Sequence, residues 1–286
     1  MKAHLEHEIE NLKNLLSGLA SRVESALAEA VRAVERKDAD LALRIIREDV
    51  LIDHEEVRIE EECLKALALY QPVAGDLRYV VTLLKVNSEL ERIGDMAVNI
   101  AERAVDLAGH AAEPSPDYGI DFLRMTQVVR LMLKKALDSL IRRNCLDALD
   151  VINRDDTVDQ LHRGNYSKVR EGIESDPSMA SYYLNLITVS RNLERIADCA
   201  TNICEDVIYL EQGRIIRHIH EDDFHSSPLP PSEAAAASFP PPPGAVPSFP
   251  AGKTQEPSHE QRNNSGDRGR GFHPGTDRLQ SDKKRL

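Results

Sequence analysis

Apolar residues recur at the three- and four-residue spacing of amphipathic helices along roughly the first 216 residues, and strand-like alternation is nearly absent. Polar turns, prolines and glycines divide this region into segments. We expect helices over residues 4–36, 40–70, 74–108, 120–143, 146–174 and 179–217. The pattern therefore predicts an all-α fold of three helices, a connector at 109–119 and three more helices.

The third and sixth predicted helices carry nearly the same thirteen residues. LERIGDMAVNIAE begins at Leu90 and LERIADCATNICE begins at Leu193, 103 positions later, with nine identities. Seven apolar positions repeat with them: Leu83, Val86, Leu90, Ile93, Ala97, Ile100 and Ala104, and then Leu186, Val189, Leu193, Ile196, Ala200, Ile203 and Val207. Such a seam faces the partner helices of a bundle. We predict two tandem three-helix bundles related by internal duplication, at residues 1–112 and 113–218.

Acidic residues follow each seam on a neighbouring stripe. The stripes are Glu91, Asp95, Asn99 and Glu102 in the first copy, and Glu194, Asp198, Asn202 and Glu205 in the second. Residues four apart on a helix lie about 5–6 Å from each other, so two carboxylates of one stripe can share an ion. Basic residues four positions away, which usually relieve such repulsion, are missing from both stripes. We interpret Arg92 and Arg195 as salt-bridge or partner contacts.

A second acidic pair lies on the preceding helix of each copy. The pairs are Asp49 with Asp53 and Asp155 with Asp159, at an offset of 106, followed by Glu56 and His162 respectively. If these helices pack antiparallel to the motif helices, Asp49, Asp53, Glu91 and Asp95 form a first carboxylate cluster, and Asp155, Asp159, Glu194 and Asp198 form a second. Oxygen-rich sites favour Mg, Mn, Ca or Fe, and carboxylates can bridge several ions. A solvated acidic face is the alternative for any one pair, but four pairs at matching positions favour metal.

Composition narrows the functional classes. The net charge is −12, and residues 217–286 carry nine basic and nine acidic side chains, so the excess lies in the helical part. An acidic body argues against sequence-independent nucleic-acid binding. Four cysteines without a CxxC pair read as free thiols of a cytoplasmic protein, and no transmembrane segment or secretory signal is indicated. Eleven of the fifteen prolines follow residue 227, so we predict a disordered tail over 219–286, in which Pro240–Pro243 are an alternative docking ligand.

Three segments make the chain resemble the PhoU family of regulators of bacterial phosphate uptake. They are the doubled LERIxD, QPVAGDLR from Gln71 to Arg78, and NICEDVIYLEQG from Asn202 to Gly213. The resemblance covers about residues 3–218. It implies two tandem three-helix bundles, commonly in a homodimer, and a cytoplasmic protein that reaches the membrane only through its partners.

The resemblance also implies a non-enzymatic function. Members of the family restrain the phosphate starvation response by contacting the phosphate-sensing histidine kinase and the ATPase of the phosphate ABC transporter. Their acidic motifs hold divalent or trivalent metal ions in multinuclear clusters, with Fe, Mn, Mg and Zn as candidates. The eight residues of the two clusters are carried over as ligands, and Glu56, Asn99, Glu102, His162, Asn202 and Glu205 as further candidates.

The sequence departs from the family's pattern in two places, and two other functions are alternatives to the one that the resemblance implies. Gly94 becomes Ala197 in the second copy, and Asp76–Arg78 is replaced by residues 179–181, so a partner contact through that element is available to the first bundle alone. The alternatives are a carboxylate-bridged metalloenzyme of ferritin-like type and a structural adaptor without metal. Ferritin-like sites use Glu-x-x-His pairs directed into the bundle core. Here the motif helices have no His at i+3, and the Asp159–His162 pair occurs once.

Overall fold

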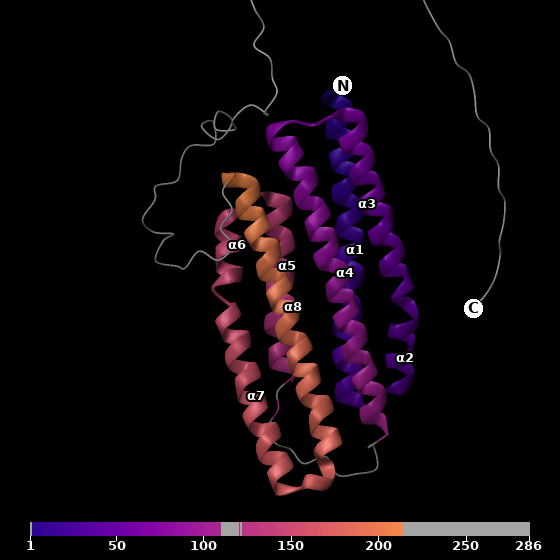
Figure 1. The fold of residues 1–286 in the computed structure, drawn as a ribbon, viewed down its shortest axis with the longest axis vertical. Coiled ribbons are helices and arrows are strands. Elements are labelled where there is room, and N and C mark those ends of the chain that lie inside the picture. Colours follow the sequence, from indigo (N-terminus) through magenta and orange to yellow (C-terminus); the bar gives the residue numbers. More distant parts are fainter. Residues whose placement is uncertain (1, 110–119, 121, 214–286) are drawn as a thin grey trace, which may run out of the picture. The chain divides into compact units, whose positions relative to one another are not determined.

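A computed structural model of the chain describes residues 2–109, 120 and 122–213, which are helical and contain no strand. The elements are α1 (Lys2–Arg36), α2 (Ala39–Glu48), α3 (Val50–Tyr70), α4 (Ala74–Ala108), α5 (Phe122–Arg142), α6 (Cys145–Ile152), α7 (Asp155–Ser175), the 3₁₀ turn η1 (Pro177–Met179) and α8 (Ala180–Gln212). They form two three-helix bundles, α1 with α2–α3 and α4, and α5 with α6–α7 and α8 (Figure 1). The predicted all-α fold is confirmed, whereas the predicted tail and nearly all of the connector lie outside the described residues.

The middle helix of each bundle is broken, where the sequence predicted one continuous helix over 40–70 and over 146–174. In the first repeat the Ile52 N–H donates to the Asp49 carbonyl at 2.7 Å. In the second repeat the Thr157 N–H donates to the Arg154 carbonyl at 3.0 Å. Bonds that close three residues apart tighten a helix into a 3₁₀ turn and interrupt it. Both breaks lie at the start of the helix that carries the acidic pair.

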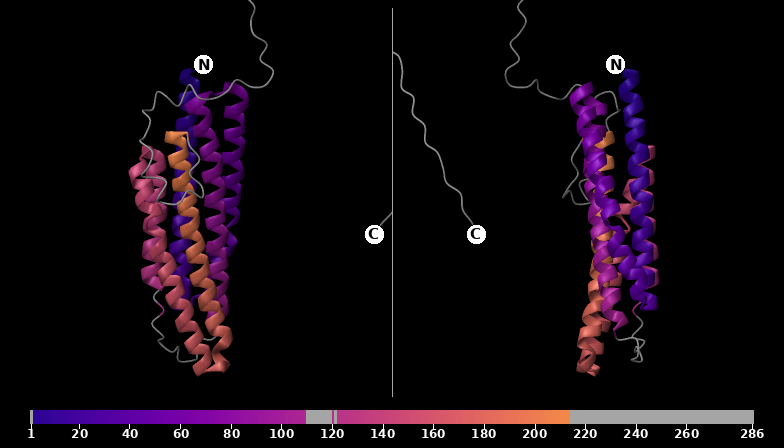
Figure 2. Two further views of the ribbon diagram at one scale, coloured as in Figure 1. Left: turned by 60° about the vertical axis from the view of Figure 1, so that its left-hand side comes forward. Right: turned by 90° about the vertical axis from the view of Figure 1, so that its right-hand side faces the viewer.

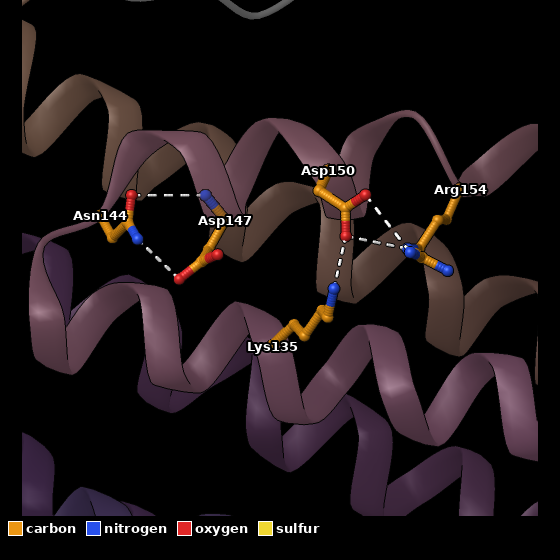
Figure 3. A network of polar contacts seen from close by, with 5 residues as sticks. All are labelled: Lys135, Asn144, Asp147, Asp150 and Arg154. Carbon is orange, nitrogen blue, oxygen red and sulfur yellow. Dashed lines mark hydrogen bonds and ion pairs between the residues drawn. The ribbon is translucent and has the colours of Figure 1, made fainter.

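The turn before each middle helix has the same local structure in both repeats. Lys37 and Arg143 adopt left-handed backbone angles, with φ of 51° and 53°. Asp38 and Asn144 follow and cap the next helix, since their side chains accept backbone N–H groups of α2 and α6. Figure 3 shows the second of these turns, with Asn144 at the start of α6. The two repeats therefore share the backbone conformation of this turn as well as their helices.

Apolar side chains of the predicted seams form the core. All fourteen seam residues are buried in α4 and α8. These two helices also pack against each other and join the bundles, and α1 meets α5 alongside them (Figure 2). All the described helices belong to one compact unit of the chain. None of these helices is long and apolar enough to cross a membrane.

The contact between α4 and α8 includes polar pairs. The Lys85 ammonium donates to the Asp206 carboxylate at 2.8 Å, and Asp206 is 3% exposed. The Asn202 amide donates to Glu89 at 3.4 Å, and Arg92 donates to the same Glu89 at 3.0 Å. Glu89 therefore connects both repeats at their interface.

Candidate metal centre

The first carboxylate cluster forms where α3 runs antiparallel to α4. At one end the Asp49 carboxylate lies over Gly94, 3.6 Å from the place that a Cβ atom would occupy there. Burial, followed by the charges of Asp53 and Asp95, raises the pKa of Asp49 to about 6. Burial and the charges of Asp95, Glu56, Asp53 and Asp49 raise the pKa of Glu91. The acids of α3 and α4 therefore add to the effect of burial on each other's pKa values.

The second carboxylate cluster forms in the same way between α7 and α8. Burial, followed by Asp198, Asp159 and Glu194, raises the pKa of Asp155 to about 6. Burial also raises the pKa values of Glu194 and Asp198, with Asp159 among the charges that add to it. The acids that raise the pKa values of their neighbours thus come from both helices of each repeat, and cation binding by the four carboxylates stays a prediction. All eight side chains are half-buried or exposed.

Counter-charges differ between the clusters. Among the described residues, no basic side chain contributes to the raised pKa values of Asp49, Glu56, Glu91 and Asp95. In the second cluster Arg163 pairs with Asp159 at 3.2 Å, and Arg195 and Arg92 counteract the raised pKa of Asp198. No Lys or Arg stands four positions from Glu194 or Asp198, as the sequence indicated, but arginines at other positions relieve the charge of the second cluster. Arg92 forms an ion pair with Glu89, as the sequence analysis expected.

Glu56 follows the acidic pair of the first cluster along α3, and His162 follows that of the second cluster along α7. The amide nitrogen of Asn87 donates to the Glu56 carbonyl at 2.9 Å and to its carboxylate at 3.1 Å. In the second repeat the His162 Nδ1 lies 2.9 Å from the Ser190 hydroxyl. Sequence reasoning missed Asn87 and Ser190, although both stand four residues before the motif glutamates Glu91 and Glu194. Polar residues buried one turn before an acidic stripe are the signal that would have found them.

Two residues at the far ends of the predicted stripes have partners outside the clusters. Glu102 pairs with Arg103 at 3.2 Å, and the Asn202 amide reaches Glu89 across the bundle interface. Asn99 is exposed, and Glu205 lies one further turn along α8. The structure therefore gives Glu102 and Asn202 partners outside the two clusters. The groups that it does bring together are Glu56 and Asn87 in one repeat, and His162 and Ser190 in the other.

The donor set fits hard or borderline cations. Carboxylate and amide oxygens suit Mg, Ca and Mn, and an imidazole adds affinity for Zn and Fe. Asn87 is 1% exposed, and its amide oxygen has no hydrogen-bond partner, so one oxygen donor beside the first cluster is unsatisfied. In the described part of the chain, no three His, Cys, Asp or Glu side chains are drawn to a single point.

The helix spacing at each cluster is maintained by a compensating change. A Cβ atom on Gly94 would lie 3.1 Å from Ile52, which is tighter than ordinary contact. The second repeat has Ala197 at this position and the smaller Val158 opposite, both buried. Removing a methylene from one helix offsets the methyl added to the other. The replacement of Gly94 by Ala197 is therefore a packing change.

The family assignment rests on both repeats. A model described as the PhoU domain matches residues 16–104 and again residues 122–207. The chain belongs to the PhoU family. Each matched segment contains one complete carboxylate cluster, so both clusters are part of the PhoU repeat itself.

Individual members of the family match over most of their length. The chain is 40% identical over 215 residues to a phosphate-specific transport system accessory protein PhoU homolog of Aquifex aeolicus, covering 74% of this chain and 95% of that protein. It is 31% identical to the accessory protein PhoU of Escherichia coli, covering 76% and 88%. The crystal structure of PhoU from Pseudomonas aeruginosa superposes with a TM-score of 0.69 at 35% identity, covering 73% and 99%. PhoU from Streptococcus pneumoniae gives 0.66 at 28% identity, covering 74% and 98%.

Proposed function

We propose that this protein is a non-enzymatic negative regulator of high-affinity phosphate uptake and of the phosphate starvation response. It acts in the cytoplasm by contacting the phosphate-sensing histidine kinase and the ATPase of the phosphate ABC transporter. One observation carries the proposal. Both repeats match a relative named as an accessory protein of phosphate-specific transport, and the match covers 95% of that relative's length.

The two carboxylate clusters supply the metal sites of this proposal. Asp49, Asp53, Glu91 and Asp95 hold cations in the first repeat, and Asp155, Asp159, Glu194 and Asp198 hold them in the second. Burial, and then the mutual repulsion of these acids, raises their pKa values, and bound cations would offset both effects. Each cluster lies on the surface between two helices of its bundle, where neutralised carboxylates and bound ions can be read by a partner protein. A homodimer would present these surfaces twice.

The regulatory role is tested in bacteria that lack their own PhoU protein. In phosphate-rich medium, the wild-type chain should lower a phosphate-starvation reporter to the level of the intact strain. A variant with Glu91→Ala, Asp95→Ala, Glu194→Ala and Asp198→Ala should fail to lower it at equal protein level and helicity. A wild-type chain without effect on the reporter would overturn the regulatory proposal.

Partner binding is tested with purified proteins. The metal-loaded chain should bind the transporter ATPase and the cytoplasmic part of the kinase, and removal of metal by a chelator should weaken binding at least about tenfold, or about 1.4 kcal/mol. Equal binding by the metal-loaded and the metal-free protein would show that partner binding does not depend on metal, and the proposed regulatory role would still stand.

A further inference from the structure

A groove runs between α1 and α5, where the first bundle meets the second. It has a volume of about 180 Å³ and shares no residue with either carboxylate cluster. Ser17, Lys134 and Ile141 line it and are exposed, so the groove opens to solvent along its edges. Its floor is made of buried apolar side chains: Leu16, Ala20, Leu83, Leu137 and Leu140. The groove is therefore an apolar surface against which a further segment can pack.

Tyr79 of α4 lines one end of the groove. Its side chain is 1% exposed, and the charged groups of Arg143 and Lys13 lie 4.7 and 5.5 Å from the centre of its ring. Its hydroxyl is buried, and no described residue forms a hydrogen bond with it. Leaving a buried hydroxyl without a partner destabilises the folded state. This end of the groove therefore has a polar group that the described residues leave unsatisfied.

The end of α8 lies beside this end of the groove. The Glu211 carboxylate, in the last turn of α8, lies 3.8 Å from Arg143, which in turn stands over the Tyr79 ring. The eleven residues that follow the helix, at 214–224, read RIIRHIHEDDF. Even a helix of eleven residues spans about 16 Å, whereas the groove residues of α5 cover about 10 Å along that helix. The segment at 214–224 is therefore long enough to follow the groove over its length.

The charges of this segment match those of α5 in order. From the Tyr79 end of the groove, α5 carries Asp138 first and then the exposed side chains of Lys134 and Arg130. The segment has Arg217 first and then three acids in a row: Glu221, Asp222 and Asp223. A segment that runs antiparallel to α5 therefore places Arg217 beside Asp138 and the three acids beside the two basic side chains.

Glu24 of α1 faces the same basic side chains from the opposite edge of the groove. Burial raises the pKa of Glu24, Arg130 and Lys134 oppose that rise, and Asp138 adds to it. Within the described part of the chain, none of the three α5 side chains forms an ion pair closer than 4 Å. With Asp138 paired to the segment, two exposed basic groups would face one half-buried acid. This end of the groove would then have room for further negative charge.

We propose that residues 214–224 of this chain dock in the groove between α1 and α5. Ile215, Ile216 and Ile219 have the spacing of one helical face and cover the apolar floor. The acids after them pair with the two basic side chains of α5. Because α1 belongs to the first bundle and α5 to the second, the docked segment joins the two repeats. The segment follows the matched PhoU repeats, which end at residue 207, and its docking does not depend on the proposed function.

A single tryptophan reports on docking, because the chain contains none of its own. Phe224→Trp in the full-length protein should show blue-shifted emission. Acrylamide should quench it at least about threefold less efficiently than Phe239→Trp, since a short tether keeps residues 214–224 at a high effective concentration beside the groove. Phe239 precedes the proline run and lies outside the proposed segment. If Phe224→Trp is quenched as readily as Phe239→Trp, or if Phe239→Trp alone is protected, the inference is wrong.

Charge reversal tests whether the groove is the surface that binds the segment. In the tryptophan reporter chain, Arg130→Glu with Lys134→Glu should raise quenching to that of an exposed tryptophan while helicity is unchanged. Protection should return when lysines also replace the three acids, Glu221, Asp222 and Asp223. Protection that survives the reversal on α5 would place the segment elsewhere and overturn the inference.

A matched control makes the same change of charge away from the groove. Arg47→Glu with Arg58→Glu changes two exposed positions of α2 and α3, which contribute no residue to the groove, and should leave the protection intact. Loss of protection in this control would show that net charge, rather than the groove, governs the reporter, and would count against the inference.

Cross-linking distinguishes docking within one chain from docking on a second copy. Ser17→Cys with His220→Cys, treated with a short bismaleimide in dilute solution, should give a cross-linked monomer. Each single variant controls for the four natural cysteines. A cross-linked dimer as the sole product would mean that the segment docks on a neighbouring copy, and the inference would be wrong.

Discussion

The two repeats of this protein share one backbone plan and differ in the side chains that complete it. Each has a left-handed residue before a capped middle helix, a break in that helix, and two acidic pairs facing each other. An ion pair connects the first helix of each bundle to the second, but the acidic and the basic residue are exchanged between the two repeats. It is Glu29 with Arg44 at 2.9 Å in the first repeat and Lys135 with Asp150 at 2.6 Å in the second.

Figure 3 shows the second of these ion pairs. Asp150 accepts from Lys135 of α5 and from Arg154 at the break between α6 and α7. A helix of one repeat placed in the other would bring like charges together at this point. Both repeats therefore have an ion pair at this place, but the acidic and basic residues have exchanged positions between them.

The largest expected effect comes from the contact that joins the repeats. Lys85→Met removes the ammonium group that faces the carboxylate of Asp206, which is almost fully buried. We expect a loss of about 1–3 kcal/mol in the free energy of unfolding, because the buried carboxylate of Asp206 loses the ammonium group that donates to it. Thr188→Met, at the equivalent position of the second repeat, should change it by less than about 1 kcal/mol. Urea denaturation of both variants checks this, and equal losses would show that the pair does not distinguish the repeats.

A glycine of α7 gives the next largest effect. A Cβ atom on Gly172 would lie 2.6 Å from the Tyr183 ring, so Gly172→Ala should cost about 2 kcal/mol. The first repeat has Ala66 and Val80 at these two positions, and adding Tyr183→Val should recover part of the loss. Gly164→Ala in the same helix meets nothing within 4 Å and should stabilise the protein by about 0.5–1 kcal/mol. Thermal unfolding compares them, and a Gly172→Ala variant as stable as the wild type would contradict the packing.

The pH dependence of stability tests both clusters without metal. Asp49 and Asp155 have folded-state pKa values raised to about 6, above the ordinary 3.8. The folded state then binds more protons than the unfolded state between these pH values, so stability should rise as the pH falls from about 7 towards 5. Asp49→Asn with Asp155→Asn should stabilise the metal-free protein at pH 7 and flatten the rise. Denaturation in a chelator at both pH values measures this rise in stability, with Glu171→Gln, which changes an exposed acid of α7, as the control. An unchanged rise in the double variant would contradict the assignment.

The smallest effect is expected at the pair of opposite sign. Glu29→Lys should cost less than about 1 kcal/mol, because the pair with Arg44 is largely exposed. Adding Arg44→Asp reproduces the charges of Lys135 and Asp150 and should restore stability. A double variant no more stable than the single one would show that the two sites are not equivalent in geometry.

Much of this architecture could be predicted from the sequence, because helical spacing and duplication both leave periodic signals. The seams of α4 and α8 are buried as their spacing predicted. The breaks beside Asp49 and Arg154 depend on local 3₁₀ bonds, which leave no signal in an apolar period. The contact of Asn202 with Glu89 depends on which face of α8 meets α4, and one helix alone does not specify that.

The most direct test of the account is the metal content of the two repeats. Elemental mass spectrometry is run on untagged wild-type protein beside the variant with Glu91→Ala, Asp95→Ala, Glu194→Ala and Asp198→Ala. The account predicts bound metal in the wild type, lost in the variant while helicity is retained. Equal metal in both proteins, or none in either, would contradict the assignment of the clusters as cation sites.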